Sequence, residues 1–256
     1  MLKKIRRLAS GSRRPPGELA IAEGIRLLEE VNNAGREIEA VVFSDRFGSA
    51  ERERNLLNVW LSREVPLFKV KENLFASVSS VQSPQGALAL VRVPQLSLAE
   101  VRLASNPLIL AACGIQNPGN LGTLIRTAAA AGATLFCTVE GTVSLRNPKV
   151  IRSSAGAFFH LPLVEHVAAA DLQAYCRRHS IRLYRADTRD GMIYDRAGMR
   201  DPCAILLGNE ASGAVADEFA AIPAIRIPMA RGVESLNVAM AGAIILFEAA
   251  RQRGTP

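Results

Sequence analysis

The sequence contains few of the residues that build metal sites or disulfide frameworks. Among its 256 residues are three histidines and four cysteines, and no Cys-x-x-Cys pair occurs. The cysteines are widely spaced and fall mostly in apolar segments: Cys113, Cys137, Cys176 and Cys203. Cysteines that are spaced in this way are typically reduced and buried in the core. Neither the cysteines nor the histidines form a metal-ligand pattern. We therefore expect a cytoplasmic protein without a metal site.

The sequence also lacks an apolar run long enough to cross a membrane. A spanning helix needs about 18 or more apolar residues. The longest candidate, Leu236 to Phe247, contains Asn237 and stops at Glu248. The composition, with 49% hydrophobic and 21% charged residues, allows a substantial core instead. At about 150 residues per domain, it predicts one or two domains, preferably two, and no membrane partner.

Two common nucleotide-binding motifs are missing. Gly114 and Gly119 have the glycine spacing of a phosphate-binding loop, but Asn120 and Leu121 replace the Lys and Ser/Thr that must follow. No Gly-x-Gly-x-x-Gly follows a predicted strand. A nucleotide-dependent or dinucleotide-dependent α/β enzyme is therefore disfavoured.

Positive charge is concentrated at the N-terminus. Six basic residues precede the first acidic residue, Glu18: Lys3, Lys4, Arg6, Arg7, Arg13 and Arg14. Because the formal net charge is +7, the rest of the chain is close to neutral. A basic arm over residues 1–16 could bind RNA phosphates and release their counterions. A solvated tail and an organelle transit peptide remain alternatives.

Hydrophobic periodicity divides the remaining chain in two. Residues 17–93 form a first unit, with a helical pattern through Ile21, Ile25, Leu28 and Val31 and an alternation of short strands and helices after it. The polar segment 94–106 carries Pro94 and reads as a linker. Residues 107–256 form a second α/β unit, in which short buried strands alternate with helices. Such alternation predicts a parallel sheet with helices on both faces.

Polar clusters follow three of the apolar runs in the second unit. They are the segment 117–127, Gly208-Asn209-Glu210, and the pair Ile227-Pro228-Met229 and Glu234-Ser235-Leu236-Asn237-Val238. Ligand sites in parallel sheets are built where strands end and helices begin. Three such loops indicate one crevice.

These segments resemble, in their order, the three motifs of the SpoU/TrmH group of the SPOUT superfamily. The resemblance covers roughly Pro107 to Arg253. It implies an RNA ribose 2'-O-methyltransferase that uses S-adenosylmethionine, is dimeric and carries a C-terminal trefoil knot. It also implies that the first unit is a small ribosomal-protein-like α/β domain, whose one local signature is Glu23-Gly24-x-Arg26-Leu27. The alternative for Glu23 and Arg26 is an ordinary solvated helix face.

The resemblance also implies roles for individual residues. The catalytic set is Arg126 with Asn120, Glu210, Ser235 and Asn237, and the cofactor pocket contains Thr188, Gly208, Ile227, Met229 and Leu236. Simpler interpretations exist: Arg126 could snorkel to water or be paired, and Glu210 could favour a helix N-terminus. Ser235 is well placed as the N-cap of a terminal helix, with Asn237 in its first turn.

The implied reaction is attack of a ribose 2'-hydroxyl on the methyl carbon of a sulfonium. No metal is required, because the leaving group departs neutral. Arginine holds its proton at a pKa above about 12, so we expect Arg126 to stabilise the developing oxyanion. Whether it is a literal base stays open. Two positions depart from the usual motifs, Asn117 in place of Asp and Ala214 in place of Leu, and they affect specificity more than activity.

Ribosomal RNA is the preferred substrate, because the extra N-terminal domain fits a structured RNA by family analogy. Transfer RNA, or a non-enzymatic RNA-binding role with the fold retained, are the alternatives. The apolar face of residues 236–247 is consistent with a helix buried partly by a second subunit, or within one subunit.

Overall fold

The computed structural model describes residues 2–9, 19–208 and 217–254. They form two compact units. Unit 1 contains Met1–Pro94 together with Arg146–His160, and unit 2 contains Gln95–Leu145 and Leu161–Pro256. The change of unit at Pro94 lies at the start of the predicted linker. The inclusion of residues 146–160 in unit 1 was not predicted from the sequence.

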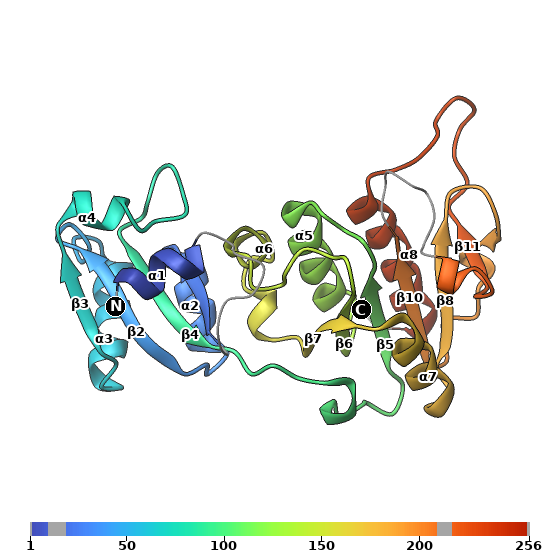
Figure 1. Cartoon of the computed structure of the whole chain (residues 1–256), viewed down its shortest axis with the longest axis horizontal. Helices are drawn as coiled ribbons and strands as arrows, with labels where there is room; N and C mark the ends of the chain where they lie inside the picture. The colour runs from blue at the N-terminus through green and yellow to red at the C-terminus, as the bar shows by residue number, and fades with distance from the viewer. Residues whose placement is uncertain (1, 10–18, 209–216, 255–256) are drawn as a thin grey trace. The chain divides into compact units, whose positions relative to one another are not determined.

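Unit 1 is built on a four-stranded mixed sheet of order β1-β4-β2-β3 (Figure 1). The strands are β1 (Leu19–Glu23), β2 (Ile38–Ser44), β3 (Leu67–Val70) and β4 (Ala87–Arg92). The helices are α1 (Leu2–Ala9), α2 (Ile25–Asn33), α3 (Glu51–Ser62), α4 (Glu72–Ala76) and α6 (Pro148–Ser153). This is the small α/β domain expected from the sequence.

The N-terminal segment is not simply a basic tail. Residues 2–9 form α1, and its Ile5 and Leu8 are buried in one hydrophobic cluster with strands β1, β2 and β4. Lys4 and Arg6 contact Glu39 and the Ser77 hydroxyl from the exposed side of the helix. The solvated-tail interpretation is therefore wrong for residues 2–9, because a short amphipathic helix gains its stability from tertiary packing. Phosphate binding by this segment stays a prediction.

The start of the first predicted helix was also misplaced. Ile21 lies in β1, whose five residues are all buried, and the helix begins at Ile25. Short apolar runs do not distinguish a buried strand from a helix. Glu23, expected as a possible solvated helix residue, is 6% exposed at the end of β1. Its carboxylate accepts hydrogen bonds from the Ser80 amide at 2.9 Å and the Ser80 hydroxyl at 2.8 Å.

Residues 146–160 belong to unit 1 through specific contacts. Helix α6 packs on β1. Arg36 Nε donates to the Phe159 carbonyl at 2.8 Å, and Arg152 donates to the Ser80 hydroxyl at 3.1 Å. Apolar periodicity cannot reveal such an exchange, because it reports that a residue is buried and not which domain buries it.

Unit 2 is built on a seven-stranded sheet of order β7-β6-β5-β10-β8-β11-β9, in which every paired neighbour is parallel. The strands are β5 (Leu108–Ala112), β6 (Leu135–Val139), β7 (Leu163–Val167), β8 (Arg182–Asp187), β9 (Met192–Ile193), β10 (Cys203–Leu207) and β11 (Ala224–Arg226). The helices are α5 (Pro118–Ala130), α7 (Ala169–Arg178) and α8 (Val238–Arg253). The predicted parallel sheet is confirmed.

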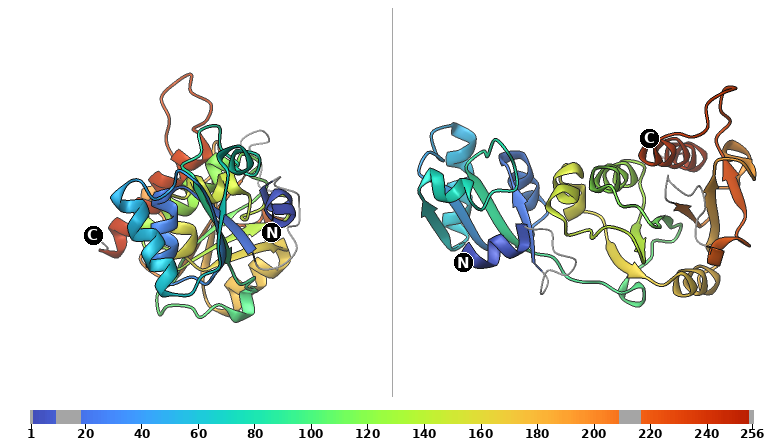
Figure 2. Two further views of the ribbon diagram at one scale, coloured as in Figure 1. Left: turned by 90° about the vertical axis from the view of Figure 1, so that its left-hand side faces the viewer. Right: turned by 45° about the horizontal axis from the view of Figure 1, so that its top comes forward.

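Helices cover both faces of this sheet. Alternate residues such as Ala204 and Leu206 of β10 pack with Leu172 and Cys176 of α7. The opposite face carries α5 and α8, and the right-hand view of Figure 2 shows these two helices on one side of the strands and α7 on the other. Helix α8 approaches closely at Gly242, where a Cβ would lie 2.5 Å from Leu124 Cδ2 of α5.

Two further expectations from the sequence can be compared with the structure. Of the helix predicted near residues 215–221, the described part contains only a 3-10 turn, Asp217–Phe219. None of the helices in the described part is long and apolar enough to cross a membrane. The trefoil knot stays a prediction.

Candidate active site

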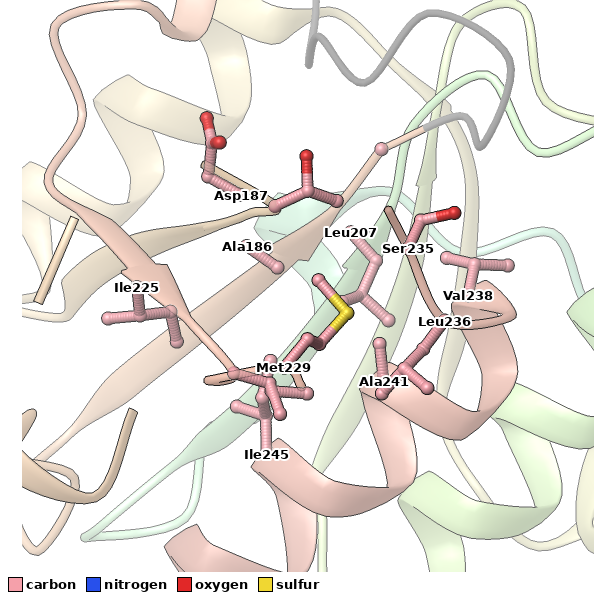
Figure 3. Close-up of a pocket in the computed structure, with 13 residues that line it drawn as sticks. Ala186, Asp187, Leu207, Ile225, Met229, Ser235, Leu236, Val238, Ala241 and Ile245 are labelled. Atoms are coloured by element: carbon pink, nitrogen blue, oxygen red, sulfur yellow. The ribbon is translucent and has the colours of Figure 1, made fainter. Parts of the chain in front are cut away.

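A cavity opens at the carboxyl edge of the unit 2 sheet, on the face covered by α8 (Figure 3). The ends of β8, β10 and β11, the segment 227–236 and α8 surround it. Its lining residues are Ala186, Asp187, Thr188, Leu207, Gly208, Ile225, Ile227, Met229, Ser235, Leu236, Val238, Ala241 and Ile245. The empty space among these residues is about 650 Å³, with the open solvent at the mouth included.

The cavity wall is mainly apolar, and its polar groups lie on opposite sides. In Figure 3, Asp187 lies across the cavity from Ser235, and the Met229 side chain lies between them. A mostly apolar pocket with a few placed polar groups is the usual form of a small-molecule site. All five residues expected to bind cofactor, and Ser235, lie in this one lining.

Asp187 is the one ionisable residue in the described cavity lining, and its carboxylate is paired with Arg185. Burial opposes ionisation of this carboxyl group, but hydrogen bonds from the Arg189 amide at 2.8 Å and the Asp190 amide at 3.1 Å, with a contact from Arg185, outweigh it. The pKa of Asp187 is therefore held below its usual value. Asp187 therefore stays ionised in the cavity wall, and Arg185 balances its charge.

The first and third motif loops meet at two asparagines. Asn237 Nδ2 donates to Asn120 Oδ1 at 3.1 Å. Asn237 Oδ1 accepts from the Ala239 and Met240 amides at 2.9 and 3.3 Å, so Asn237 is the N-cap of α8. The prediction that Ser235 caps this helix is wrong, because Asn237 satisfies the free amides and leaves Ser235 two residues before the cap.

Arg126 lies apart from the cavity lining. It is exposed on α5, and its guanidinium makes no hydrogen bond or ion pair with another residue in the described part of the chain. Among the described residues, Arg126 is therefore not paired with another side chain, and it is exposed to water. Asn117, at the start of the same motif, is the N-cap of α5 and accepts from the Gly119 amide at 2.8 Å.

The structure thus gathers part of the predicted site. No residue of the segment 117–127 lines the cavity, and Glu210 lies outside the described residues. Sequence reasoning missed several lining residues: Ala186, Asp187, Leu207, Ile225, Val238, Ala241 and Ile245. Asp187 carried a usable signal, because it is a polar residue at the end of a strand next to Thr188.

Two family models match the chain. The model of the SpoU rRNA Methylase family matches residues 107–247, and the model of the MRM3-like substrate binding domain matches residues 1–89. The first model covers more than half of the chain, and it includes all of the described cavity-lining residues and Arg126.

Individual relatives and solved structures agree with these models. The chain is 30% identical over 191 residues to the 23S rRNA (guanosine(2553)-2'-O)-methyltransferase RlmP of Bacillus subtilis, covering 73% of each protein. It resembles the crystal structure of an RNA 2'-O ribose methyltransferase with a TM-score of 0.82 and 32% identity, over 98% of this chain and 95% of that one. An AdoMet-bound rRNA methyltransferase from Sinorhizobium meliloti matches with a TM-score of 0.85 and 25% identity, over 98% and 94%.

The matched segment, the parallel sheet and the cavity at its carboxyl edge lead to one assignment: this chain belongs to the SpoU rRNA methylase family.

Proposed function

We propose that this enzyme transfers the methyl group of S-adenosylmethionine to the 2'-hydroxyl of a ribose in ribosomal RNA. A SpoU-family chain with these relatives is an S-adenosylmethionine-dependent RNA 2'-O-methyltransferase. The proposal adds the target RNA, the roles of individual residues, a homodimer and a cytoplasmic location. The cavity between residues 186–188, 207–208 and 225–245 is the observation that carries it.

The cavity fits the cofactor chemically. Adenosine and the methionine chain offer apolar surface to a wall built from Ile225, Ile227, Met229, Leu236 and Ile245. Thr188 and Ser235 supply hydroxyl groups to the cavity wall, and Asp187 adds an ionised carboxylate that is paired with Arg185. Gly208 leaves backbone accessible at the end of β10.

The remaining residues orient the substrate and stabilise charge. When bound, S-adenosylmethionine supplies a methyl group on positively charged sulfur, and that sulfur departs neutral. Asn120 and Asn237 hold each other through their 3.1 Å hydrogen bond and fix the ends of α5 and α8, so they act as positioning residues. Arg126 is available to stabilise the negative charge that develops on the ribose oxygen. Ser235 and Glu210 complete the proposed set.

Unit 1 is proposed to bind the RNA substrate, because residues 1–89 match a substrate binding domain. Ribosomal RNA is favoured over transfer RNA by the names of the relatives, among them the RlmB 23S rRNA methyltransferase of Xylella fastidiosa at 35% identity over 57% of this chain.

A cytoplasmic location fits the four free, buried cysteines. Burial raises the pKa of the Cys176 thiol to about 12, so this thiol stays protonated at neutral pH.

A calorimetric titration tests the proposed function. We expect binding of S-adenosylmethionine and its demethylated product and no binding of ATP, because the cavity lacks a phosphate-binding lysine. Mapping of ribose methylation in RNA from cells with and without the gene should then show one missing methyl group in ribosomal RNA. RNA binding without cofactor affinity would instead indicate a non-enzymatic protein, and a lost methyl group in transfer RNA would correct the substrate.

The proposed homodimer rests on an apolar stripe on α8. Met240, Ile244 and Phe247 are 59%, 36% and 51% exposed. Their spacing of four and three residues places them on one face of the helix. An exposed apolar face of this kind marks an interaction site more often than bare surface. We assign it to a second copy of the chain.

Substitution of Phe247 by Glu should weaken dimerisation at least tenfold, because a charge would be buried in an apolar contact. Sedimentation velocity over a range of protein concentrations measures this. The matched control is Leu61→Glu, which changes an equally exposed leucine on α3 of unit 1 (62% exposed) and should leave self-association unaltered. Dimerisation of Phe247→Glu at the wild-type affinity would refute the assignment of the stripe.

A further inference from the structure

Two arginines occupy loops that border the cavity and take no part in the site described so far. Arg189 follows β8, directly after the lining residue Thr188, and Arg231 lies between the lining residues Met229 and Ser235. Both are exposed, and neither side chain has a hydrogen-bond or ion-pair partner within the described ranges.

Arg231 is held at the tip of a turn. The Val233 amide donates to the Ala230 carbonyl at 3.2 Å, and Gly232 has a φ of +89°. A positive φ at the third residue is required in a type II turn, and glycine adopts it without strain. The turn reverses the chain within the connection between β11 and α8, and this connection projects beyond the ends of the strands (Figure 1).

The backbone at Arg189 is held by Asp187. The Asp187 carboxylate accepts the Arg189 and Asp190 amides and fixes the chain where it leaves β8. Asp187 itself lines the cavity, so the backbone that carries Arg189 is anchored to the cavity wall. The position of this loop therefore does not depend on the guanidinium, which stays available to a ligand.

The chemistry of the substrate accounts for two such arginines. A ribose within RNA carries a phosphate on each side, and a guanidinium binds phosphate oxygens through two parallel hydrogen bonds. Protein contacts to phosphates fix the register of a nucleic acid without reading its bases. Methyl transfer needs the 2'-hydroxyl in line with the bond that breaks, so holding both phosphates contributes orientation.

We propose that Arg189 and Arg231 bind the phosphates on either side of the target ribose and so present its 2'-hydroxyl to the cavity. The proposal rests on the proposed function, because it assumes that the cavity holds the methyl donor. It assigns an RNA-positioning role to two loops of unit 2, in addition to any RNA binding by unit 1.

Salt-dependent RNA binding by Arg189→Gln and Arg231→Gln tests the proposal. Binding of a ribosomal RNA fragment is measured without cofactor, so the result does not depend on methylation. For each variant we expect a roughly tenfold weaker affinity and a slope of log affinity against log salt that is smaller by about 0.7. In turnover assays the KM for RNA should rise more than kcat falls, while calorimetry should give wild-type affinity for S-adenosylmethionine.

The matched control is Arg177→Gln on α7. Arg177 is also exposed, and its side chain has no hydrogen-bond or ion-pair partner among the described residues. It should bind RNA as the wild type does. Salt slopes of Arg189→Gln and Arg231→Gln equal to the control overturn the proposal. So does weaker self-association of these variants with an unchanged salt slope, which would assign the two side chains to a second copy. If the two variants show the expected smaller salt slopes but the wild-type protein does not bind S-adenosylmethionine, the proposed function is refuted. The phosphate contacts of Arg189 and Arg231 are then still supported.

Discussion

Arg126→Ala should lower kcat for RNA methylation at least a hundredfold while cofactor binding survives. The guanidinium is exposed on α5 and lies outside the cavity lining, so its removal leaves the cofactor contacts intact. Loss of one preorganised donor to a developing oxyanion typically costs two to three orders of magnitude in rate. Single-turnover methylation of ribosomal RNA, together with calorimetric titration of S-adenosylmethionine, measures both quantities.

Two further variants make the Arg126 experiment specific. Arg126→Lys keeps the charge but loses the planar fork, so it should recover only a small part of the rate. Arg177→Ala, on α7, should methylate at the wild-type rate. Near-wild-type turnover of Arg126→Ala on the true substrate would remove Arg126 from the catalytic set.

Gly208→Val should weaken binding of S-adenosylmethionine at least tenfold, which corresponds to about 1.4 kcal/mol. Gly208 lines the cavity at the end of β10, and a branched side chain there would occupy space that the cofactor needs. Calorimetry on the folded variant measures the affinity, and thermal unfolding establishes that the fold is retained.

Gly198→Val is the matched control for this glycine. Gly198 lies outside the described cavity lining, and a Cβ there would meet the flexible end of the Arg182 side chain at 3.2 Å and the Tyr184 hydroxyl at 4.0 Å. Its cofactor affinity should be that of the wild type. If Gly208→Val also binds S-adenosylmethionine normally, the cofactor is not held at the end of β10.

The sequence determined the architecture of unit 2 because burial and strand order leave a strong periodic signal. The apolar run 135–139 and the helical pattern 169–178 predict β6 and α7 with their observed bounds. Five further apolar runs predict β5, β7, β8, β10 and β11 to within three residues, whereas the two-residue β9 was not predicted. In a parallel sheet all carboxyl ends meet at one edge. The loops at Gly208 and around Met229 could therefore be assigned to one crevice from the sequence, and the resemblance to the SpoU/TrmH motifs added Thr188.

Tertiary structure alone decided several other points. Residues 146–160 and Ile5 of α1 are buried by partners far away in the sequence, and a local pattern does not say which partner buries a residue. The choice of Asn237 over Ser235 as N-cap depends on where the preceding loop enters the helix, which a local sequence pattern does not fix. Arg126 belongs to one of the three family motifs, but it does not line the cavity. Helix α5 begins at Pro118, and Arg126 lies in a later turn of this helix, farther along its axis.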